Sequence, residues 1–130
     1  MPNVEQIQIE EIIRNSSDLK VSNEKNINIL VNNSRILLSN NKVDLALRLI
    51  NQVLDVDSNN ELALELAADI YIEKDKYDLA EKCYFKLLNI QESSSIYLKL
   101  ANILYKQEKD ELALDNYFKA LEGVTYETHL

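Results

Sequence analysis

The sequence predicts an all-α fold in which antiparallel helix pairs stack into a repeat array. Three alanines set the period, because Ala46 and Ala80 are 34 positions apart and Ala80 and Ala113 are 33 positions apart. Each alanine opens a similar run of residues, and a fixed period of this length is typical of stacked repeats rather than of one globular core. The 130 residues include one glycine and one proline, so we expect long helices joined by short polar links.

Residues 1–26 precede the periodic part and are expected to form a leader of one helix plus a loop. Apolar residues from Val4 to Ile13 fall roughly on one helical face, although Gln6–Ile9 also alternates as a strand does. The polar cluster Asn15–Asp18 is typical of a loop and is expected to end the helix.

Three helix pairs are expected over residues 27–60, 61–93 and 94–122. The first helix of the first pair should end at Asn40–Asn41, because asparagine tolerates the left-handed backbone that follows many helices. The last helix is expected to end before Gly123, which leaves residues 123–130 as a short tail.

Four positions recur with the same spacing in each predicted pair. They are Ser34/Ala46/Ile50/Val53, Ala68/Ala80/Tyr84/Leu87 and Ala101/Ala113/Tyr117/Ala120. This pattern resembles the tetratricopeptide repeat (TPR) family over residues 27–122, although the glycine and the inter-repeat proline usual in that family are missing. The resemblance implies a right-handed superhelical stack, or α-solenoid, in which small residues let paired helices approach and the aromatic residue fills the gap to the next pair.

Charge and composition exclude several classes of function. The net charge is −8, of which residues 61–130 contribute −6 from 14 acidic and 8 basic residues. Such a chain repels nucleic acid and anionic membrane surfaces, so neither is an expected partner, whereas a basic protein or peptide would be attracted. No apolar stretch approaches membrane-spanning length and no signal peptide is recognisable, so we expect a cytoplasmic protein without membrane insertion.

Catalytic, metal and cofactor chemistry are not expected. His129 is the one histidine and lies next to the C-terminal residue, which argues against a histidine-based dyad or metal site. Gly123 is the one glycine, so no glycine-rich phosphate loop is present, and no cofactor is expected. Cys83 falls inside a helical pattern, where a packed thiol is the simplest interpretation.

In the TPR family the first helix of each pair lines a concave groove, and the resemblance carries this role to the matching positions. They are Arg35 and Leu38 in the first pair, Leu62, Glu65, Asp69, Ile72 and Glu73 in the second, and Leu98, Asn102, Tyr105 and Lys106 in the third. Glu65, Asp69 and Glu73 are spaced by four and share one helix face, where like charges are mildly destabilising. The stripe is either a slot for lysine or arginine of a partner or a solvated helix face.

The sequence therefore predicts a three-repeat adaptor that binds a protein or peptide in an acidic, partly apolar groove. The alternatives are a dedicated chaperone for a basic or aggregation-prone client, and a recognition segment of a larger enzyme. The last helix carries Ala113, Tyr117, Ala120 and Leu121, which we expect to be partly bare. This end should recruit a partner, self-associate or fray.

Overall fold

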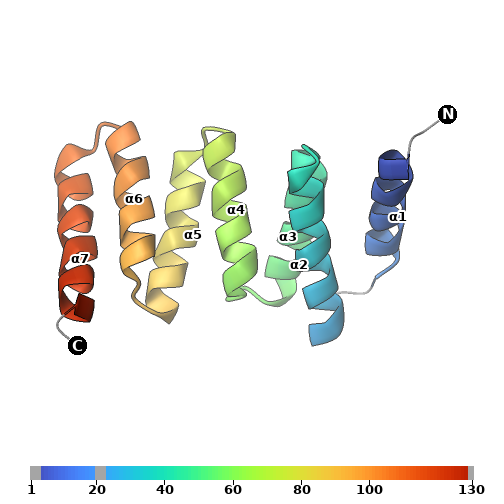
Figure 1. The fold of residues 1–130 in the computed structure, drawn as a ribbon, viewed down its shortest axis with the longest axis horizontal. Coiled ribbons are helices and arrows are strands. Elements are labelled where there is room, and N and C mark those ends of the chain that lie inside the picture. The colour runs from blue at the N-terminus through green and yellow to red at the C-terminus, as the bar shows by residue number, and fades with distance from the viewer. Residues whose placement is uncertain (1–3, 20–22, 129–130) are drawn as a thin grey trace. The chain divides into compact units, whose positions relative to one another are not determined.

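The computed structural model describes residues 4–19 and 23–128, and every regular element in these ranges is an α-helix (Figure 1). The helices are α1 (Val4–Asp18), α2 (Glu24–Ser39), α3 (Val43–Val56), α4 (Glu61–Glu73), α5 (Tyr77–Ile90), α6 (Ser94–Lys106) and α7 (Asp110–Thr128). The all-α prediction is confirmed, and the elements follow the expected order of helix pairs. The chain forms two compact units, Met1–Leu66 and Ala67–Leu130, and α4 crosses the division between them.

In the first unit, α1 packs against α2 and α2 packs against α3. The prediction that Asn15–Asp18 forms a loop is wrong, because α1 continues to Asp18. Ser17 Oγ donates a hydrogen bond of 2.9 Å to the Ile13 carbonyl, which satisfies its hydroxyl inside the helix. Ser16 is buried, and its Oγ accepts a 2.9 Å hydrogen bond from the side-chain amide of Asn33 on α2. These serines therefore belong to the helix and to its contact with α2.

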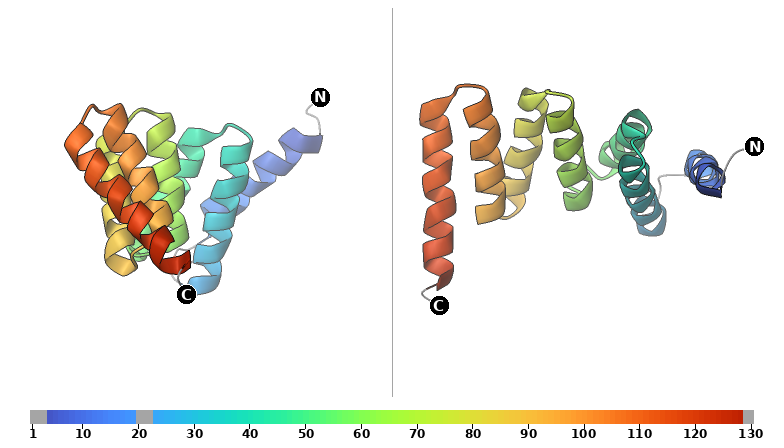
Figure 2. Two further views of the ribbon diagram at one scale, coloured as in Figure 1. Left: turned by 60° about the vertical axis from the view of Figure 1, so that its left-hand side comes forward. Right: turned by 45° about the horizontal axis from the view of Figure 1, so that its top comes forward.

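In the second unit, α5 packs against α6 and α6 packs along α7. Figure 2 shows α7 continuing past the start of α6 (right panel), so the prediction that the helix ends before Gly123 is wrong. One glycine lowers helix stability by only about 1 kcal/mol relative to alanine and does not forbid helical backbone. A Cβ on Gly123 would overlap Ser94 Oγ at the start of α6, so the missing side chain permits the close approach of these two helices.

The repeating small and aromatic positions form the core that the period predicts. Eleven of the twelve positions are buried, and the remaining one, Tyr117, is half-buried: Ser34, Ala46, Ile50, Val53, Ala68, Ala80, Tyr84, Leu87, Ala101, Ala113, Tyr117 and Ala120. Ser34 is tolerated where the other pairs have alanine because its Oγ donates a 2.8 Å hydrogen bond to the Leu30 carbonyl. The register read from the sequence is therefore the register of the packed helices.

A left-handed residue repeats with the same period between the two helices of each pair. Asn41, Asp75 and Glu108 have φ angles of 62°, 59° and 62°. In each turn the next residue is a lysine whose backbone N–H bonds to a carbonyl five residues earlier: Lys42 to Leu37 at 2.8 Å, Lys76 to Tyr71 at 2.8 Å and Lys109 to Leu104 at 3.0 Å. The expected helix end at Asn40–Asn41 is confirmed, and non-glycine residues take the same conformation in the other two turns.

Replacing Glu108 with glycine is expected to stabilise the protein by about 0.5–1 kcal/mol. Left-handed backbone is strained for a residue with a Cβ but not for glycine, although glycine also gains entropy in the unfolded chain. Asn41→Gly should give a smaller gain because asparagine tolerates this region better. Thermal melts of both variants and of a Glu108→Ala control would measure the effect, and an equal gain in the alanine control would contradict the explanation.

Candidate protein-binding surface

The acidic stripe lies along α4. Glu65 is half-buried, while Asp69 and Glu73 are exposed, and the spacing of four places the three carboxylates one above another on the helix. Leu62 is exposed at the start of this helix and Ile72 is half-buried near its end. The predicted residues of α4 thus combine acidic side chains with accessible apolar surface.

The third predicted set lies on α6, within the second unit. Leu98, Asn102 and Tyr105 follow one another at helical spacing, and all three are exposed, as is Lys106. Asn102 is also structural, because its Oδ1 accepts a 2.7 Å hydrogen bond from the Tyr117 hydroxyl on α7. The bond connects the exposed face of α6 to the side of α7.

The first predicted set lies on α2, within the first unit. Arg35 is exposed and Leu38 is half-buried. The Arg35 backbone carbonyl accepts a 3.0 Å hydrogen bond from Ser39 Oγ near the end of the helix. Both predicted side chains are thus accessible to a partner, and each of the three sets is exposed or half-buried on its own helix.

The prediction that one apolar face of α7 is partly exposed to solvent is only partly correct. Ala113 and Ala120 are buried, because the closely packed α6 leaves these small side chains no access to solvent. Tyr117 is half-buried and Leu121 is exposed, as expected. Exposed apolar residues that the sequence reading missed are Leu112 and Leu114. Leu114 could have been found from the repeat itself, because it occupies the position of the polar Glu81 one period earlier.

Among the residues that the structure describes, Cys83 is a candidate nucleophile and the acidic side chains are candidate metal ligands. Cys83 is buried, and burial raises the pKa of its thiol, an effect that the nearby Lys86 only partly opposes. A buried thiol with a raised pKa is a poor nucleophile. Among residues 4–19 and 23–128 no group of histidine, cysteine and acidic side chains could hold a metal ion, and His129 lies outside these residues.

Two tyrosine hydroxyls are held by neighbouring carboxylates. Tyr77 donates a 3.0 Å hydrogen bond to Asp75, which raises the pKa of Tyr77. Desolvation, and then a 3.0 Å hydrogen bond to Glu92, raise the pKa of Tyr97. Both phenols therefore stay protonated at neutral pH and act as hydrogen-bond donors. Within the part of the chain that the structure describes, no helix is long and apolar enough to span a membrane.

Comparison with known proteins supports the TPR resemblance, although no protein-family model matches the sequence. Over 92 residues the chain is 29% identical to the TPR repeat-containing protein MJ1428 of Methanocaldococcus jannaschii. The match covers 71% of this chain and 16% of that protein, so the chain spans about one sixth of its curated relative's length.

Solved structures give the same result for the fold. The crystal structure of YrrB, described as a TPR protein with an unusual peptide-binding site, has a TM-score of 0.68 and 26% identity, and the match covers 92% of this chain and 57% of YrrB. The crystal structure of MamA has a TM-score of 0.74 at 12% identity, with 94% of this chain and 75% of MamA covered, and is similar in fold alone. The resemblance to TPR proteins is confirmed, and the helices described fit about three repeats.

Proposed function

We propose that this TPR-like chain is a non-catalytic adaptor that binds a segment of a partner protein. The observation that carries the proposal is the set of accessible acidic and apolar side chains on α4, together with the exposed Leu98 and Tyr105 on α6. The similarity to YrrB supports it, because YrrB is described as having a peptide-binding site. A cytoplasmic location and self-association through α7 stay predictions.

The stripe of Glu65, Asp69 and Glu73 favours a basic partner segment. The three carboxylates stand on one helix face, where a lysine or arginine of the partner would relieve their mutual repulsion. The charge of the chain supports the same choice, since residues 61–130 carry a net charge of −6. Leu62 and Ile72 on the same helix would contact apolar parts of the segment.

Selection of random displayed peptides against the full chain tests this proposal. We expect the selected peptides to be rich in lysine and arginine, and their affinity to fall as salt rises, because exposed charge pairs are screened. Glu65→Lys/Glu73→Lys should abolish the preference for basic residues while the circular dichroism spectrum stays unchanged. Glu10→Lys/Asp55→Lys is the matched control, since it changes the same charge at exposed positions of α1 and α3.

Loss of the basic preference in both variants would show that net charge, not the stripe, attracts the peptides. Absence of any selected peptide would contradict the adaptor proposal itself. Affinity capture of natural partners separates the remaining alternatives. A single obligate client would favour a dedicated chaperone, and a longer reading frame with a catalytic domain would favour a recognition segment of an enzyme.

A further inference from the structure

An apolar strip runs along one side of α7. It consists of Leu114, Tyr117 and Leu121, which are spaced by three and four residues and so share a face of the helix. Leu114 and Leu121 are 54% and 60% exposed, and Tyr117 is half-buried. The position of the Tyr117 side chain is fixed by a hydrogen bond that its hydroxyl donates to Asn102 Oδ1 on α6.

One repeat earlier, the residues equivalent to this strip are covered by the next helix of the chain. The equivalent positions on α5 are Glu81, Tyr84 and Leu88, and α6 packs against α5. There Tyr84 is only 1% exposed, and Glu81 and Leu88 are largely covered. A helix that lies on α7 as α6 lies on α5 would therefore cover Leu114, Tyr117 and Leu121.

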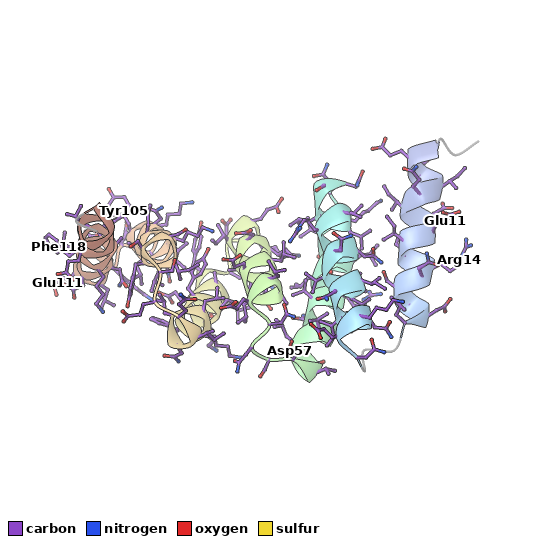
Figure 3. The ribbon with its side chains drawn as sticks, turned by 60° about the horizontal axis from the view of Figure 1, so that its bottom comes forward. Glu11, Arg14, Asp57, Tyr105, Glu111 and Phe118 are labelled. Carbon is purple, nitrogen blue, oxygen red and sulfur yellow. The ribbon has the colours of Figure 1, made fainter. Side chains whose placement is uncertain are left out.

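The same comparison separates the strip from other exposed apolar residues of α7. Phe85 on α5 stays 53% exposed although α6 packs against its helix, and the equivalent Phe118 is 54% exposed. Exposure of Phe118 is therefore the ordinary state of this position and does not indicate a missing neighbour. Figure 3 shows Phe118 and Glu111 on the side of α7 that faces away from α6.

Charge indicates what kind of helix would dock. A polar contact to α5 comes from the turn that follows α6: Lys109 Nζ lies 3.4 Å from the Glu81 carboxylate, and the Gln107 amide donates a 3.3 Å hydrogen bond to the same oxygen. Leu114 replaces Glu81 at the equivalent position of α7, so the charge of a docking helix is indicated by the other side chains of α7. Residues 110–128 carry five acidic residues and one lysine. That lysine, Lys119, lies 5.6 Å from the centre of the Tyr97 ring on α6. The helix that carries the strip is thus itself strongly acidic.

We propose that the strip of Leu114, Tyr117 and Leu121 docks an amphipathic helix of a partner protein that carries basic residues beside its apolar face. A second copy of this chain fits less well, because pairing two α7 helices would bring their acidic residues together at a cost. The proposal does not depend on the acidic stripe of α4, since the strip lies on another helix and binds a helix rather than an extended segment.

A synthetic peptide with leucines at helical spacing and lysines elsewhere, about 15 residues long so that a helix can form on binding, is the probe. It is titrated into the full chain, into Leu114→Gln/Leu121→Gln, and into the control Phe85→Gln/Phe118→Gln, whose two phenylalanines occupy the repeat position that stays exposed. Both variants remove two half-exposed apolar side chains and leave the charge of the chain unchanged. Glutamine and leucine have similar helix propensities, so α7 should form in both, which circular dichroism checks.

We expect affinity to fall about tenfold or more in Leu114→Gln/Leu121→Gln and to change by less than about twofold in the control, because only the strip leucines become buried. The methyl resonances of Leu114 and Leu121 should shift on titration. A peptide with glutamate in place of lysine should bind far more weakly. Equal losses in both variants, no loss in either, or equal binding of the glutamate peptide would each overturn the proposal. A dimer of the unmodified chain that Leu114→Gln/Leu121→Gln abolishes would show that a second copy is the occupant.

Discussion

Tyr84→Ala is expected to lower the free energy of unfolding by about 3–5 kcal/mol, which is the usual cost of removing a buried aromatic side chain. Tyr84 is 1% exposed and ranks among the largest fully buried side chains of residues 4–19 and 23–128. It lies on α5 where α6 packs, so its removal leaves a cavity that the surrounding helices fill only partly.

Tyr117→Ala is the matched comparison, because Tyr117 occupies the same repeat position 33 residues later. It is half-buried, so truncation should cost only about 1–2 kcal/mol, part of it from the lost hydrogen bond to Asn102. Urea titrations followed by circular dichroism would measure both values. Equal losses would show that the side chain of Tyr117 is covered in solution, and would contradict the exposed strip on α7.

The fold could be predicted from the sequence because the same spacing of small and large apolar residues occurs in all three helix pairs. The alanine period fixes which residues meet where helices cross, and Ala46, Ala80 and Ala113 are all buried. The turn at Asn41 was also readable, since asparagine is a common left-handed residue. Aspartate also tolerates this region, as at Asp75, but Glu108 was not readable, because the short link between two packed helices and the hydrogen bond of Lys109 impose a conformation that glutamate does not favour.

Two incorrect predictions share a physical cause. Polar or small residues predicted the end of a helix, whereas in the structure they continue the helix and make contacts with a neighbouring helix. Ser16 is typical of loops by composition, yet it is buried in α1 and bonded to Asn33. Gly123 is typical of helix ends, yet it permits α7 to pass Ser94. Contacts between separate helices decide both cases, and a single sequence does not display them. The candidate site residues were readable as positions on helices, but their partner is not encoded in them.

The close approach of helices at the small positions should not tolerate a larger side chain. Ala80→Leu and Ala101→Leu are each expected to destabilise the second unit by about 1–3 kcal/mol or more, because three extra carbon atoms must enter a filled crossing. Both alanines are fully buried, on α5 and α6 respectively. Overpacking of this kind forces side chains from their preferred rotamers and shifts the backbone.

Asn89→Leu provides the control, since it adds a leucine at an exposed position of α5 and should leave stability within about 0.5 kcal/mol of the unmodified chain. Hydrogen exchange would locate the effect, because the amides of α5 and α6 should open more readily in Ala80→Leu and Ala101→Leu than in the control. An unchanged melt for Ala80→Leu would mean that the crossing has room for a larger residue. The alanine period would then mark helix propensity rather than close packing, and the equivalence of α5 and α7 on which the docking strip depends would lose its basis.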